Sequence, residues 1–228
     1  IGTMTGALKV ADDTEISDSA ITGASAQILN AQGSASYTDS ALTVEHFEVG
    51  AYQGTVADTI NVELSNTDLT VTGKTHTTGF GGLWVGDVAT AEDSQKEISL
   101  TVSNGSAVNA KLVSIRDGAE LTVTGEGTTW LSNETGFIGD VTVDDKAVMT
   151  AELLNMYGNV DVKNGATLTV NGTVDTAILN VWVGNSKLVV SGANAQVNAK
   201  WIDIWDGAPT VTVENGATLA VESIKASR

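Results

Sequence analysis

The chain has 228 residues and a formal net charge of −17, contains no cysteine, and is 42% hydrophobic. The apolar content is enough for a folded core and argues against a disordered chain, and the lack of cysteine excludes disulfides, thiolate metal sites and cysteine nucleophiles. Binding to phosphate groups needs clustered lysine and arginine, so the acidic balance argues against nucleic acid and anionic lipid as partners.

The apolar runs of the sequence are short. They reach three residues, as at 188–190, whereas a membrane-spanning helix needs about 20. We therefore expect no membrane insertion. The sequence begins at Ile1, with no initiator methionine and no basic-then-apolar leader, from which we expect a processed, exported protein.

The first part of the chain repeats less clearly than the rest. Residues 41–50 and 59–64 alternate apolar and polar side chains, as half-buried strands do. Terminal repeats of a stacked array diverge because they cap an open edge. We therefore predict diverged N-terminal or capping coils over residues 1–65. Residues 66–228 are predicted to form a repeat-built β-solenoid, continuous with those coils as one domain.

From residue 66 onward three short patterns recur. The first is a strand that stops at glycine, as in residues 69–73, 121–125, 168–172 and 188–192. The second is an apolar residue, any residue, an apolar residue and then a tight turn, as in residues 83–87, 113–117, 181–185 and 202–206. The third is an alternating strand followed by Asn-Gly or a related pair, as in residues 100–108, 141–149, 160–168 and 211–219.

The three patterns predict a stack of short strands. Alternation places one face of each strand inward, and Asn-Gly accepts the positive φ that sharp corners need. We therefore predict an all-β fold, a parallel β-helix with coils of roughly 20–25 residues. An antiparallel β-sandwich is the alternative, because Asn-Gly is also a hairpin signal. The inward slots are predicted at Val102, Ile115, Val123, Val143, Val162, Val170, Val183, Val190, Ile204 and Val213.

Two stretches of the sequence carry a family resemblance. Residues 181–197 (VWVGNSKLVVSGANAQV) and residues 121–130 (LTVTGEGTTW) resemble the passenger domains of autotransporter adhesins of Gram-negative bacteria. The resemblance covers about residues 65 to 222. It implies a right-handed parallel β-helix displayed outside the cell, and it implies no catalytic residues.

Residues able to catalyse hydrolysis are few and stand in no known motif. His46 is predicted to be a half-buried strand residue and His76 a solvated one. The doublets Asp12-Asp13 and Asp144-Asp145 are predicted to decorate turns, and Arg116 to pair with Asp117 at the surface. We therefore assign no catalytic residue, no metal site and no cofactor, although the acidic surface leaves room for weak calcium binding.

Four tryptophans are the candidate binding or assembly residues. Trp84 and Trp182 stand between inward apolar residues, and Trp201 and Trp205 flank a similar pair. Alternation therefore points all four rings outward, where stacked coils would align them as an exposed stripe for a sugar or a partner subunit. The alternative is that a loop or a neighbouring coil covers them.

These observations favour an extracellular or cell-surface structural or adhesive β-solenoid that is not an enzyme. Its partners would be glycans, host surfaces or copies of itself. The alternative hypotheses are a subunit of an extracellular filament or surface layer and, third, a polysaccharide lyase or hydrolase, a class of enzyme that gathers carboxylates on one face of a β-helix.

Overall fold

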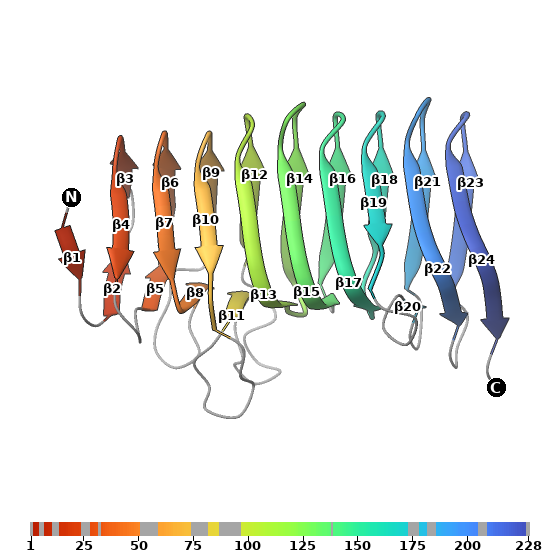
Figure 1. Ribbon diagram of the computed structural model, residues 1–228, viewed down its shortest axis with the longest axis horizontal. Coiled ribbons are helices and arrows are strands. Elements are labelled where there is room, and N and C mark those ends of the chain that lie inside the picture. The colour runs from red at the N-terminus through yellow and green to blue at the C-terminus, as the bar shows by residue number, and fades with distance from the viewer. Residues whose placement is uncertain are drawn as a thin grey trace.

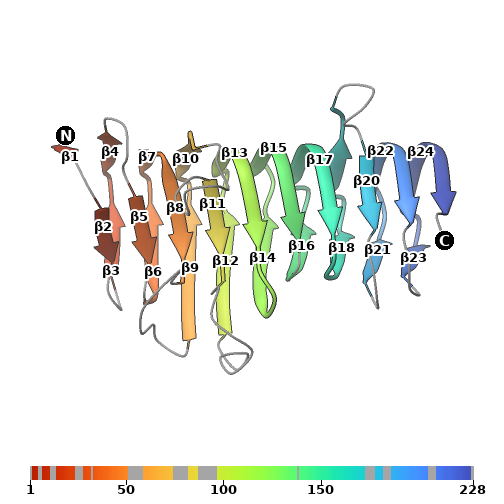
Figure 2. The same ribbon diagram turned by 90° about the horizontal axis from the view of Figure 1, so that it is seen from below.

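The computed structural model is a stack of parallel β-strands that follow one another along a single long axis (Figure 1). Figure 2 shows the same order from a second direction. The structure describes residues 2–4, 7–10, 14–23, 28–31, 33–50, 59–73, 82–86, 97–137, 139–172, 178–181, 186–204 and 209–226. Within these residues no helix is long and apolar enough to cross a membrane.

Two sheets contain the strands of the described residues. The nine-stranded sheet forms the first wall of the solenoid: β3 (Thr14–Ser17), β6 (Ala35–Thr38), β9 (Thr59–Ser65), β12 (Glu97–Ser103), β14 (Ala119–Thr124), β16 (Asp140–Asp144), β18 (Val160–Lys163), β21 (Lys187–Ser191) and β23 (Thr210–Glu214).

The second sheet has 15 strands and contains two walls. The longer series is β1 (Gly2–Met4), β4 (Ala20–Gly23), β7 (Ala41–Val44), β10 (Asp68–Val71), β13 (Ala107–Ile115), β15 (Thr129–Phe137), β17 (Val148–Met156), β19 (Thr167–Val170), β22 (Gln196–Ile204) and β24 (Thr218–Ala226). The shorter series is β2 (Ala7–Val10), β5 (Ile28–Ala31), β8 (His46–Val49), β11 (Gly82–Val85) and β20 (Ile178–Val181).

The nine-residue strands β13, β15, β17, β22 and β24 serve both walls. The first half of β13 pairs with β10 and its second half with β11. The register between β13 and β15 is continuous except at Lys111 and Asn133, which mark the corner. The first halves and their partners form the second wall, and the second halves with β2, β5, β8, β11 and β20 form the third.

Every strand pairing among the described residues is parallel. This confirms the predicted all-β parallel solenoid. The antiparallel sandwich alternative is wrong, because Asn-Gly here joins two walls of one coil instead of folding a strand back on its neighbour.

The coil length matches the predicted period wherever the corners are short. Paired residues of successive coils are 19 apart from Val141 to Val160 and 22 apart from Ala107 to Thr129. Ile60 and Ile98 are 38 apart, because this coil has longer connections on either side of β11. Both sheets run across residue 65, so the N-terminal coils belong to the same stack.

The core consists of columns of inward side chains, one per coil. One column on the first wall joins Leu64, Val102, Val123, Val143, Val162 and Val190, all fully buried. The predicted inward positions Ile115 and Val170 are also buried, and Ile204 packs against the core. Val183 lies outside the described residues.

Val213 has the predicted inward register, but its side chain is 42% exposed. It occupies the inward slot, where it pairs with Val190. Strand β23, however, has a partner strand on one side only within the described residues. No further described coil packs over it.

The corners carry the turn chemistry that the sequence predicts. Asn104 and Asn164 have φ of 54° and 50°, and the glycines after them have φ of 81° and 80°. A different glycine, Gly139, is required for space: a Cβ there would meet the carbonyl oxygens of Arg116 and Ala119. Both kinds of glycine let the chain turn a corner without strain.

A column of buried hydroxyls holds successive coils together at the corner between the first and second walls. The backbone N–H of Ser40 donates to Thr67 Oγ1 over 3.3 Å, and the N–H of Thr67 donates to Ser106 Oγ over 2.9 Å. Further along, buried alanines at 147, 166 and 195 take the place of the hydroxyls. The corner is therefore polar in the N-terminal half and apolar afterwards.

Candidate interaction surfaces

The second wall presents an outer face with almost no charge, which we call the threonine face. Its two rows of outward side chains lie in register across the strands from β7 to β24. One row is Thr43, Thr70, Asn109, Leu131, Thr150, Thr169, Asn198 and Ala220. The other is Ala41, Asp68, Ala107, Thr129, Val148, Thr167, Gln196 and Thr218. Asp68 is the one ionisable residue of the two rows.

Two large apolar side chains lie exposed at the centre of the threonine face. Leu131 is 49% exposed and Val148 is 40% exposed. Leu131 pairs with Thr150, and Val148 pairs with Thr129, so the two are diagonal neighbours on adjacent strands. Exposed apolar side chains that adjoin one another mark interaction sites more often than isolated ones do.

The first wall presents the opposite kind of outer face, which we call the acidic face. Its outward ionisable residues are Glu15, Glu63, Glu97, Glu120, Asp140, Asp144, Asp161, Lys163, Lys187 and Glu214. Carboxylates outnumber the two lysines, so this wall holds much of the net negative charge. The outer faces of the first and second walls thus differ in charge.

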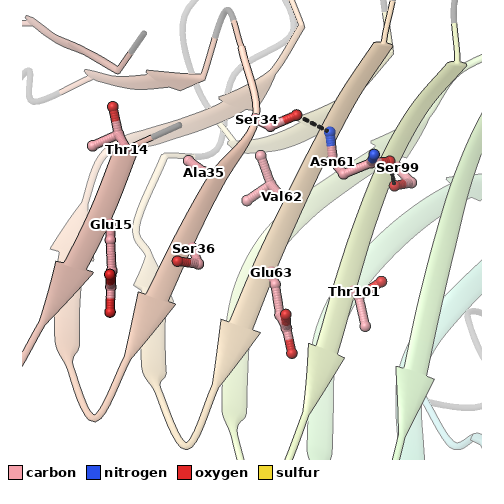
Figure 3. Close-up of a pocket in the computed structure, with 10 residues that line it drawn as sticks. All are labelled: Thr14, Glu15, Ser34, Ala35, Ser36, Asn61, Val62, Glu63, Ser99 and Thr101. Atoms are coloured by element: carbon pink, nitrogen blue, oxygen red, sulfur yellow. Dashed lines mark hydrogen bonds between the residues drawn. The ribbon is translucent and has the colours of Figure 1, made fainter. Parts of the chain in front are cut away.

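A groove of about 580 Å³ crosses β3, β6, β9 and β12 on the acidic face (Figure 3). Small side chains on β6, such as Ser36, lie between Glu15 on β3 and Glu63 on β9. This difference in size hollows the surface. The described lining is Thr14, Glu15, Ser34, Ala35, Ser36, Asn61, Val62, Glu63, Ser99 and Thr101.

Hydrogen bonds between neighbouring coils order one side of the groove. The Asn61 backbone N–H donates to Ser34 Oγ over 3.2 Å, and Ser99 Oγ donates to Asn61 Oδ1 over 2.8 Å (Figure 3). Ser103 Oγ donates to the carboxylate of Glu63 over 3.3 Å. The groove therefore presents carboxylates, hydroxyls and an amide, and its described lining contains no lysine or arginine.

The expected exposure of Trp84 is wrong: the side chain is 5% exposed. Its neighbours Leu83 and Val85 point into the core, so the indole does lie on the outer side of the third wall. The ring is covered there by two side chains. Arg116 places its guanidinium 4.7 Å from the ring centroid, and the ring of His46 packs edge-on at 5.2 Å.

The register places Trp84 and Trp201 in different rows. Starting from Trp84, the pairings lead through Ser114, Gly136, Asn155 and Asn180 to Asp203, whereas Trp201 pairs with Ile178 and Ser223. Trp201 is partly exposed, with Lys200 Nζ 5.8 Å from its ring centroid. Trp182 and Trp205 lie outside the described residues.

His46 is a strand residue, as predicted, but it is fully buried and not half-buried. A corner at Glu45 changes the alternation, so that Phe47 and Val49 face the core and His46 lies on the outer side. Its Nε2 lies 3.4 Å from a carboxylate oxygen of Glu48. Arg116 contacts Trp84, a partner that the sequence did not indicate. His76 lies outside the described residues.

The carboxylate doublet at 144 and 145 decorates a turn, as predicted. Asp145 has a positive φ of 46°, and its N–H is bonded to the Asp144 carboxylate. Asp144 also accepts a hydrogen bond from Asn164 on the next coil over 2.7 Å. The doublet at 12 and 13 lies outside the described residues. Within the part that the structure describes, no three His, Asp or Glu residues are placed to hold a metal ion.

Comparisons with protein-family models, curated proteins and solved structures gave no match. The architecture defined by the strands is that of a parallel β-solenoid. The resemblance to autotransporter passenger domains stays a prediction.

Proposed function

We propose that the chain is an extracellular or cell-surface structural and adhesive β-solenoid that contacts glycans, host surfaces or copies of itself, and that it acts without catalysis. The observation that carries the proposal is the set of long outer walls with side chains in register. A repeating surface of this kind suits an extended partner better than a compact substrate.

The groove on the acidic face supports glycans as one class of partner. Carboxylate oxygens accept hydrogen bonds from sugar hydroxyls, and the Ser and Thr hydroxyls both donate and accept. Glu15 and Glu63 would repel an anionic sugar, because the described lining supplies no positive charge. The groove therefore favours neutral polysaccharides over acidic ones.

Binding to immobilised neutral and acidic polysaccharides and to host-cell surfaces tests the proposal. Ser36→Phe fills the middle of the groove with an outward ring and should abolish neutral-glycan binding. Thr142→Phe makes the same kind of change further along the acidic face and should leave binding intact. If the wild type binds no polysaccharide and no cell surface, the adhesive function is wrong.

The same incubations separate the proposal from an enzymatic function. Reducing ends or unsaturated products released from any polysaccharide would contradict it.

We also propose that the acidic face binds calcium weakly. Glycan binding measured with calcium and with a chelator shows whether the cation contributes.

A subunit of an extracellular filament or surface layer is the second candidate function. It is favoured by the threonine face, whose exposed Leu131 and Val148 lie on the least charged wall. Electron micrographs of the purified protein distinguish the two functions, since regular polymers support the filament and isolated rods the adhesin.

A further inference from the structure

We infer that the threonine face binds the threonine face of a second copy of this chain. The inference rests on the proposed adhesive function and names the wall and the partner. It goes beyond a general capacity for self-association, because it excludes the acidic face as the contact between copies.

Charge is the first reason for this assignment. Two copies that each have a net charge of −17 repel one another, and the repulsion is greatest where carboxylates face each other at short distance. If two acidic faces met, rows of Glu and Asp from one copy would face the same rows of the other. If two threonine faces met, Asp68 would be the one charged residue of the two rows on each side. The threonine face is therefore the wall at which two copies can approach most closely.

The repeat distance is the second reason. Strands in a sheet are about 4.8 Å apart, so the outward rows of the threonine face repeat with that spacing. A second copy has the same spacing, and rows of identical period can interdigitate along their whole length, as they do between stacked sheets. The central pair Leu131 and Val148 would then leave water together with the methyl groups of the threonines.

The area that two threonine faces can bury limits the strength of their association. The second wall from β7 to β24 is about 34 Å long and about 13 Å wide across its two rows, a flat area of about 450 Å² per copy. Stable complexes bury about 800 Å² per partner. We therefore expect weak association that increases with protein concentration and with salt, because salt screens the repulsion between the copies.

Analytical ultracentrifugation over a range of protein and salt concentrations tests the inference on the whole chain. The wild type should sediment as a monomer at low salt and as a dimer or larger species at high salt. The double variant Leu131→Glu with Val148→Glu places two charges at the centre of the face and should stay monomeric. The double variant Thr122→Glu with Thr212→Glu adds the same charge to the acidic face and should associate at high salt as the wild type does.

Cross-linking gives a readout that does not depend on added charge. The chain contains no cysteine, so single cysteine variants report one position each. With a short bismaleimide, Val148→Cys should give covalent dimers at high salt, and Thr122→Cys on the acidic face should not. Circular dichroism and thermal melting of every variant show whether the fold is kept.

Three results would overturn the inference. The wild type could remain monomeric at high salt and high protein concentration, both double variants could lose association equally, or Thr122→Cys could cross-link as well as Val148→Cys. A monomeric wild type that still binds polysaccharide would refute self-association and leave the adhesive function in place. A wild type that stays monomeric and binds no polysaccharide and no cell surface would refute both.

Discussion

The Arg116 guanidinium lies over the indole of Trp84, 4.7 Å from its ring centroid. The contact joins two successive coils of the third wall, because Trp84 belongs to β11 and Arg116 follows β13. His46 on β8 adds the preceding coil, 5.2 Å from the indole centroid. Three coils thus meet at one buried ring on the outer side of a strand, so Trp84 has a structural role.

Replacing Trp84 should therefore destabilise the fold. Loss of a buried tryptophan typically costs about 3–5 kcal/mol, and we expect Trp84→Ala to lower the free energy of unfolding by that amount in urea denaturation. Arg116→Gln should cost about 0.5–2 kcal/mol through the lost cation–π contact. Trp201→Ala, at a partly exposed ring, is the control and should cost less than Trp84→Ala. Equal stability of Trp84→Ala and the wild type would contradict the buried contact.

The core register predicts opposite outcomes for two adjacent residues of β14. Val123 is fully buried, whereas Thr122 points outward. Val123→Asp would bury an unpaired carboxylate and should lower the free energy of unfolding by roughly 3 kcal/mol or more. Thr122→Asp keeps the carboxylate in water and should change it by about 0.5 kcal/mol or less. Thermal melting of both variants checks the register, and similar melting temperatures would show that it is wrong.

Local signals in the sequence predicted most of the architecture. Asn164 and Gly165 identify a corner from two residues alone, because few residue types accept positive φ. Val123 and Val143 are identified as core by alternation within one strand. Such features depend on neighbours along the chain, so they can be read without knowing which strands pair.

The surface features depend on pairing and could not be read in this way. Leu131 and Val148 become neighbours only through the register between β15 and β17. Alternation points both Trp84 and Trp201 outward, yet the register places them in different rows. Alternation also cannot reveal that an outward ring is covered by residues from other coils, as His46 and Arg116 cover Trp84.

Like charges face each other on the acidic face at Glu120 and Asp140, which are paired residues on β14 and β16. Directly opposed like charges destabilise a sheet by about 0.2–1 kcal/mol. Glu120→Gln should therefore raise the melting temperature at low ionic strength, by about 0.4–4 °C for a chain of this size. The gain should shrink at high salt, because salt screens the repulsion.

The change in melting temperature that salt or calcium causes shows whether the effect of Glu120→Gln comes from charge. Salt or calcium should raise the melting temperature of the wild type more than that of Glu120→Gln. Thr122→Gln, on the same strand and face, removes no charge and should respond to salt as the wild type does. A gain for Glu120→Gln that is unchanged at high salt would show that it does not come from charge repulsion.

Tyr37 makes the stability sensitive to alkaline pH. Its ring is fully buried and packs against Phe47, with the ring centroids 6.2 Å apart. The hydroxyl is buried and has no hydrogen-bond partner among the described residues. Burial raises the pKa of Tyr37 well above its usual value, because the phenolate would lose its hydration without gaining a partner.

The folded state therefore holds the Tyr37 proton more tightly than the unfolded state does. Stability from this group is complete below the unfolded pKa of about 10, and it is lost as the pH rises from there toward the folded pKa, by up to about 1.4 kcal/mol per pH unit. Tyr37→Phe removes the ionisable group and the unpaired hydroxyl. It should unfold at a higher alkaline pH than the wild type, with equal or greater stability at pH 7. Tyr157→Phe, at an exposed ring, is the control and should follow the wild-type profile. Urea denaturation at a series of pH values from about 8 to 11.5 measures the difference, and a Tyr37→Phe profile that coincides with that of the wild type would show that this phenol does not set the alkaline limit.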